Sequence, residues 1–179
     1  MQKRLNVRNY PPTFHPEEWE KCYKTGCYTY ALNIKSKEFK LIGDFIGKRC
    51  TYRTNIKDLL KTFRLEVKTL GFSVREIHLD DLEHLKPGEY AIYLKRDKHI
   101  GYYHFFRRDD NGVWSHKHPD EEPEEIDLME EEYVEENDCF LRGWLFALKV
   151  KDRWLNNHLS FIFHINPLKK QVFYDRLWK

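Results

Sequence analysis

Residues Leu85–His118 read LKPGEYAIYLKRDKHIGYYHFFRRDDNGVWSHKH, and this stretch decides the fold. Pro87 and Gly88 mark a turn at its start. Three runs rich in aromatic and aliphatic residues follow the turn, at residues 89–94, 101–106 and 113–118. Runs of this kind, separated by short polar connections, predict three strands of an antiparallel meander.

The connection between the second and third strands decides which side chains share a face of the sheet. A two-residue Asn-Gly turn would put His104 on the face opposite to His116 and His118. A three-residue loop at 110–112 (Asp-Asn-Gly) instead pairs Phe106 with His116. His118 then lies opposite His104, with His116 on the diagonal. Because an Asp-Asn-Gly tripeptide suits the longer loop, we predict that the three imidazoles lie close together on one face.

Two helical segments are predicted before the meander. Apolar residues recur with helical spacing over 56–70, and Asn55 and Gly71 supply a cap and a stop. Cys27 opens a shorter run with helical spacing at 27–37. A thiol in the first turn of a helix lies near unpaired backbone amides, so we expect its pKa to fall below the usual value of about 8.5.

Two further strands complete the predicted sheet. Residues 72–79 alternate between apolar and polar side chains, and residues 139–150 form a long apolar run that we expect beside the histidine strands. The predicted fold class is therefore α+β, with helices packed on one face of an antiparallel sheet. The 179 residues fit a single domain, 1–179, with an acidic loop or insertion at 119–138.

Composition excludes several classes of protein. Hydrophobic residues make up 41% of the chain and aromatic residues 16%, which is typical of a globular protein. Because the sequence shows neither a signal peptide nor a run of about 18 apolar residues, we expect a cytoplasmic protein with no membrane partner. The net charge of +2 provides no field that would attract nucleic acid. The acidic segment 120–137 predicts a solvated surface or, alternatively, a docking site for a basic protein partner.

The cysteine count argues against a disulfide scaffold. Four cysteines are scattered along the chain, Cys22, Cys27, Cys50 and Cys139. They are too few for a scaffold in a chain of this length, so reduced thiols are expected.

The order of these features resembles the NlpC-like cell-wall peptidases, a papain-related superfamily. In that family a cysteine opens a helix, an L-x-P-G-D-like turn leads into a strand, and a histidine begins the next strand. A third polar residue, often histidine, follows after a short hairpin. The counterparts here are Cys27, the turn at Leu85–Glu89, His104 and His116. The resemblance covers roughly residues 20–118.

The resemblance implies a papain-like fold and a cysteine hydrolase that needs no cofactor. Cys27 would be the nucleophile and His104 the base that takes its proton and returns it to the leaving group. His116, or alternatively His118, would orient His104. The substrate would be a peptide, an isopeptide or another acyl compound such as an amide or ester, cleaved through a thioester.

Two other functions fit the same residues. His104, His116 and His118, together with Cys27, are a nitrogen and sulfur donor set of the kind that binds zinc. A non-enzymatic binding module, such as viruses and phages carry, would instead use the aromatic strands and the acidic segment as contact surfaces. Retention of zinc favours the first alternative, whereas inactivation by a thiol reagent without metal favours the hydrolase.

Overall fold

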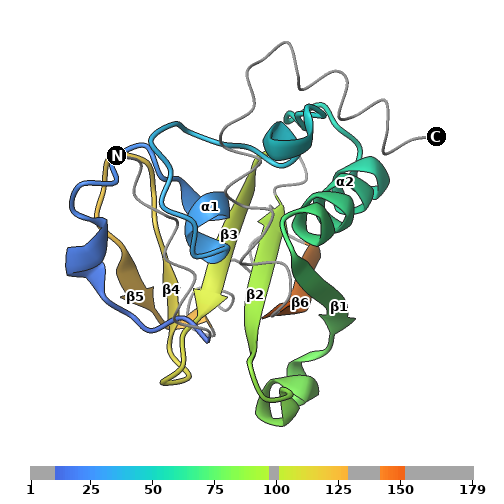
Figure 1. Cartoon of the computed structure of the whole chain (residues 1–179). Helices are drawn as coiled ribbons and strands as arrows, with labels where there is room; N and C mark the ends of the chain where they lie inside the picture. Colours follow the sequence, from blue (N-terminus) through green and yellow to red (C-terminus); the bar gives the residue numbers. More distant parts are fainter. Residues whose placement is uncertain (1–10, 97–100, 129–141, 152–179) are drawn as a thin grey trace, which may run out of the picture.

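The structure, a computed structural model, describes residues 11–96, 101–128 and 142–151. These residues form a six-stranded sheet in the order β1-β6-β2-β3-β4-β5, in which neighbouring strands are antiparallel (Figure 1). The strands are β1 Phe72–Ile77, β2 Glu89–Arg96, β3 Tyr103–Arg108, β4 Trp114–His116, β5 Glu124–Ile126 and β6 Arg142–Val150. The predicted α+β class with an antiparallel sheet is confirmed.

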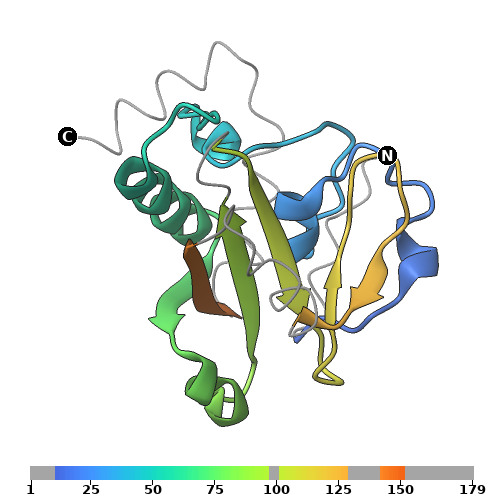
Figure 2. The same ribbon diagram turned by 180° about the vertical axis from the view of Figure 1, so that it is seen from behind.

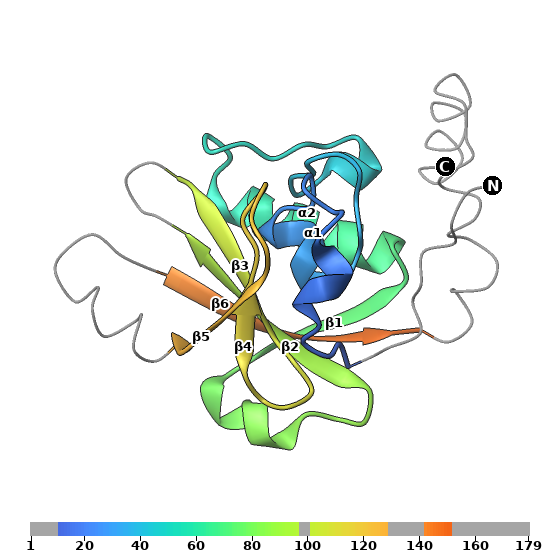
Figure 3. The same ribbon diagram turned by 90° about the vertical axis from the view of Figure 1, so that its left-hand side faces the viewer.

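Two α-helices lie on one side of this sheet, α1 Cys27–Ala31 and α2 Ile56–Thr69 (Figures 1 and 3). The 3₁₀ segments are η1 Pro16–Trp19, η2 Asp44–Ile46 and η3 Leu79–His84. The Asn55 side chain accepts a hydrogen bond from the Asp58 amide, which confirms the predicted cap of α2. Helix α1 is shorter than the predicted run, because the chain turns at Asn33, whose φ is +54°.

Each face of the sheet packs its own apolar cluster, because alternate side chains of a strand point to opposite faces. On the helix-covered face, the Phe63 ring packs against Phe105 and Phe146, with centroids 5.6 and 4.9 Å away. The opposite face, seen from behind in Figure 2, carries a smaller cluster. Its buried members are Ile77, Ala91, Tyr93, Phe106, Leu128, Leu145 and Ala147. No helix among the described residues is long and apolar enough to cross a membrane.

One predicted position in the second half of the chain was wrong. Strand β6 pairs with β1 and β2 rather than with the histidine strands. The reason is that β6 is buried on both faces, as expected of a central strand, with Leu145 in one cluster and Phe146 in the other. The segment 119–138, predicted to be an acidic loop or insertion, contains the short strand β5. Cys139 and the residues of this segment beyond 128 lie outside the described residues.

The hairpin between β3 and β4 has the predicted three-residue loop. The Asp109 amide donates to the Val113 carbonyl, and the Gly112 amide donates to the Asp109 carbonyl, both at 2.9 Å. Gly112 has a φ of +85°, a left-handed conformation that glycine adopts without steric cost. Arg107 consequently pairs with Ser115, and both side chains point towards the helices.

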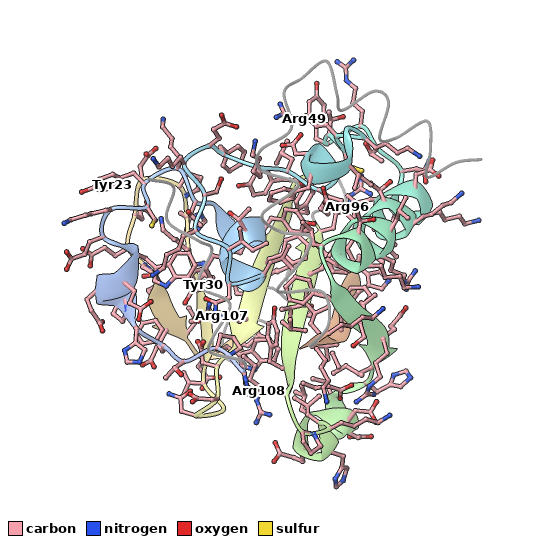
Figure 4. The ribbon with its side chains drawn as sticks, in the orientation of Figure 1. Tyr23, Tyr30, Arg49, Arg96, Arg107 and Arg108 are labelled. Atoms are coloured by element: carbon pink, nitrogen blue, oxygen red, sulfur yellow. The ribbon has the colours of Figure 1, made fainter. Side chains whose placement is uncertain are left out.

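A buried polar network fastens this hairpin to α1. The Arg107 guanidinium lies over the Tyr30 ring, 4.1 Å from its centroid, between α1 and β3 (Figure 4). Arg107 also forms an ion pair with Asp109, at 2.7 Å, and the side chains of both residues are fully buried. Ser115 donates a hydrogen bond to Asp109, and its Oγ lies 2.8 Å from the Tyr30 hydroxyl. The network fixes β4 against β3 and thereby the strand positions from which the histidines project.

Candidate metal centre

Three imidazoles gather on the sheet face that the helices leave uncovered. His104 lies on β3, His116 ends β4, and His118 follows two residues later. His104 Nε2 is 2.9 Å from His116 Nδ1, and the His118 ring centroid is 4.7 Å from that of His104. One nitrogen from each ring lies within 4.8 Å of the other two. The predicted convergence of the three histidines is confirmed.

A carboxylate behind His116 fixes the orientation of its ring. Strand β5 pairs with β4 so that Glu124 lies opposite His116, and Glu124 Oε1 is 2.9 Å from His116 Nε2. Because an ionised carboxylate only accepts hydrogen bonds, it holds the proton of neutral His116 on Nε2. The Nδ1 lone pair then faces His104. No sequence pattern predicts this contact, because Glu124 belongs to a dense acidic run without the alternation of a strand.

His104 is neutral over the physiological pH range. Burial lowers its pKa to about 3, and electrostatic interactions with His116, His118 and Lys95 add to this effect. Lys95 is the residue directly across from His104 in the pairing of β2 with β3. A neutral imidazole is the form that binds a metal ion, so His104 does not have to lose a charge before it acts as a ligand.

The low pKa of His104 predicts acid sensitivity of the metal-free protein. The unfolded chain binds a proton at this imidazole below about pH 6.5, whereas the folded protein does not bind it until the pH nears 3. Stability is therefore full above pH 6.5 and falls as the pH is lowered. Between pH 7 and 4.5 we expect protonation of this residue to lower the free energy of unfolding by roughly 2–3 kcal/mol.

This loss is measured by urea denaturation at several pH values in the presence of a chelator. The variant His104→Phe keeps an aromatic ring beside Phe106. Its free energy of unfolding should fall between pH 7 and 4.5 by roughly 2–3 kcal/mol less than that of the wild type. If the free energy of unfolding depends on pH in the same way for the wild type and the variant, His104 is not the group that causes the acid sensitivity.

Cys27 lies elsewhere in the molecule. It opens α1 as predicted, but it is 8% exposed and packs in the helix-side cluster with Tyr103 and Phe105. His104 lies between these two residues on β3 and therefore points to the other face of the sheet. The structure brings the three histidines together and does not add Cys27 to them.

The expectation of a lowered thiol pKa was wrong. Burial raises the pKa of Cys27 to about 11, and hydrogen bonding to backbone groups, including that of Phe105, offsets only part of this effect. Helix α1 has five residues, so its dipole is too small to overcome the loss of solvation. Cys22, Cys27 and Cys50 are free thiols, as expected for a chain without a disulfide scaffold.

Comparison with known proteins gives one informative similarity. No model of a known protein family matches the chain, and no solved structure matches it. The chain is similar to insoluble matrix shell protein 1 of Ruditapes philippinarum. The two are 32% identical over 109 residues, which make up 58% of this chain and 64% of that protein. Because the match spans less than two thirds of the relative, the function has to be inferred from the geometry of the chain itself.

Proposed function

We propose that this chain binds a divalent transition metal, with zinc as the first candidate, through His104, His116 and His118. The observation that carries the proposal is the convergence of three imidazole nitrogens within 4.8 Å of one another. Neutral nitrogen donors suit zinc, copper or nickel and disfavour magnesium and calcium, which prefer oxygen ligands. The name of the shell-matrix relative states no chemistry, so it does not contribute to the choice of metal.

To hold zinc, the three nitrogens, which lie within 4.8 Å of one another, must approach the spacing of tetrahedral ligands. With Zn–N bonds of about 2.0–2.1 Å and tetrahedral angles, two ligand nitrogens lie about 3.3 Å apart. His104 Nε2 and His116 Nδ1 are 2.9 Å apart, a distance at which His104 donates a hydrogen bond to His116. Placing a metal ion between the two nitrogens moves the His104 proton from Nε2 to Nδ1 and requires the two rings to separate by a few tenths of an ångström. Small rotations of the two imidazoles supply this movement.

The proposal is tested by titrating zinc into the metal-free protein in a calorimeter. We expect one saturable binding site per chain, with the His104 proton moving from Nε2 to Nδ1 as zinc replaces the hydrogen bond between His104 and His116. Absence of saturable binding, or a stoichiometry unchanged when all three histidines are replaced by phenylalanine, would refute the proposal. Circular dichroism of the triple variant establishes that it is folded.

Glu124 should contribute to metal affinity without touching the metal. The variant Glu124→Gln loses the charged acceptor that holds the proton on His116 Nε2, so we expect zinc to bind about 10- to 100-fold more weakly. Glu125→Gln is the matched control, because Glu125 is exposed and its neighbour across the sheet is Ser115 rather than a histidine. Competition with a chromophoric chelator measures both affinities. Equal losses in the two variants would assign the effect to surface charge.

A cysteine hydrolase of the NlpC-like, papain-like type is the second candidate function. The hydrogen bond between His104 and His116 favours it, because a second polar group orients a general base in this way. Cys27 would be the nucleophile acting on a peptide, isopeptide or other acyl substrate. This proposal is weaker than metal binding, because Cys27 and His104 lie on opposite faces of the sheet and burial raises the pKa of the Cys27 thiol.

Alkylation by iodoacetamide, followed for each cysteine as a function of pH, separates the two proposals. The hydrolase requires Cys27 to react at lower pH than Cys22 and to lose this advantage in His104→Ala. Metal binding by the three histidines predicts slow alkylation of Cys27 in both proteins.

A further inference from the structure

The three histidines leave a metal ion one ligand short of the four that zinc usually takes. Within the described part of the chain, the cluster of metal-binding groups contains His104, His116 and His118 and no fourth member. Glu124 does not supply the missing ligand, because its carboxylate contacts Nε2 of His116 whereas Nδ1 of that ring faces the other imidazoles. Sites with three protein ligands keep the fourth position for water or an exchangeable ligand.

Solvent reaches this side of the cluster. His116 is 6% exposed, but His104 and His118 are only partly buried. Both residues are thus partly open to solvent rather than enclosed in the core. An external ligand can therefore reach a metal ion held there.

The charges around the site favour an anion. Three neutral imidazoles leave the +2 charge of the metal ion uncompensated, and Glu124 is occupied by its contact with His116. Lys95 adds a positive charge on the same face, since it is directly across from His104 on the neighbouring strand. A metal ion beside an ammonium group attracts a ligand of negative charge.

We propose that the fourth coordination position binds a small carboxylate anion, which the ammonium group of Lys95 helps to hold beside the metal. This inference rests on the proposed metal-binding function. The carboxylate displaces a metal-bound water, so no covalent bond of the protein is made or broken. The lysine stem is flexible and its ammonium group has three donors, which allows it to reach a carboxylate oxygen next to His104.

Replacing Lys95 with methionine should change the affinity for the metal ion and the affinity for acetate in opposite directions. In Lys95→Met the stem remains and the positive charge is lost. The metal ion should bind slightly more tightly, because a repulsive charge has gone, whereas acetate should bind the metal-loaded protein about 3- to 10-fold more weakly. General damage to the site would instead weaken the binding of both the metal ion and acetate. Lys61→Met is the matched control, since Lys61 is exposed on α2, on the other side of the sheet, and should change neither affinity.

The test uses the cobalt-loaded full chain and acetate as the probe, with the visible absorption of cobalt as the readout. A saturable spectral change in the wild type that needs more acetate in Lys95→Met supports the proposal. No spectral change with acetate, while cobalt remains bound, overturns it and leaves the metal-binding function intact. Equal acetate affinities of the wild type and Lys95→Met overturn the role of Lys95. Failure of the wild type to bind cobalt refutes the metal-binding function itself, and the inference with it.

Discussion

Replacing His116 with phenylalanine is expected to weaken zinc binding by more than about 100-fold. His116 is both a proposed ligand and the residue through which Glu124 acts, and loss of an outer carboxylate alone usually costs about 10- to 100-fold. Phenylalanine keeps a ring that packs beside Phe106, whose centroid lies 5.3 Å from that of His116. The effect should therefore fall on the metal ion rather than on the fold. Competition with a chromophoric chelator measures the affinity.

A histidine outside the cluster provides the control for this experiment. His84 is exposed at the end of η3, and His84→Phe should bind zinc as the wild type does. If His116→Phe retains the wild-type affinity, the three-histidine site is wrong. Thermal unfolding of both variants in the presence of a chelator checks that the replacements leave the metal-free protein folded.

The second large effect concerns the buried ion pair between Arg107 and Asp109. Asp109→Ala leaves the Arg107 guanidinium in the interior without its carboxylate partner, since both side chains are fully buried. Breaking a buried pair in this way typically lowers the free energy of unfolding by about 3–5 kcal/mol. Urea denaturation of the variant measures the loss. Asp110→Ala, one residue further along, should cost less than about 1 kcal/mol because Asp110 is exposed.

A double variant distinguishes the contribution of the ion pair to stability from the cost of leaving one charge buried without its partner. Arg107→Met combined with Asp109→Ala removes both charges, and we expect it to be more stable than Asp109→Ala alone. A double variant that loses the sum of the two single effects would mean that the two residues act independently. That result would contradict the 2.7 Å contact between them.

The histidine cluster could be predicted from the sequence because its geometry depends on local rules. The Asp-Asn-Gly loop sets the pairing of β3 with β4, and alternation along the strands then places His104, His116 and His118 on one face. Turn chemistry and the two-residue period of a strand are readable from a few neighbouring residues. No long-range contact is needed to derive them.

The environment of Cys27 could not be predicted in the same way. A glycine followed by a cysteine at the start of an apolar run indicates the first turn of a helix, which is correct. Whether the thiol faces solvent depends on how Tyr103 and Phe105 pack against that turn, and they are more than seventy residues away in the chain. Burial reverses the direction of the pKa shift that the helix position alone would give.

The contact of Glu124 with His116 and the neighbours of β6 could not be predicted, because strand pairing is a long-range property. A dense acidic run carries no pattern that distinguishes a solvated loop from a short edge strand, yet β5 places Glu124 behind His116. The apolar run that forms β6 predicts a strand but does not say which neighbours it has. Burial of Leu145 and Phe146 on opposite faces, seen only in the folded sheet, identifies β6 as a central strand.

The absorption spectrum of the cobalt-loaded wild-type protein reports the number and type of metal ligands together. We expect one tightly bound cobalt per chain, with the visible bands of a nitrogen-ligated ion and no sulfur-to-cobalt charge-transfer band. Absence of these bands would mean that His104, His116 and His118 do not form a metal site. A strong charge-transfer band from sulfur would contradict the account in a different way, because it would bring a thiolate into the ligand set.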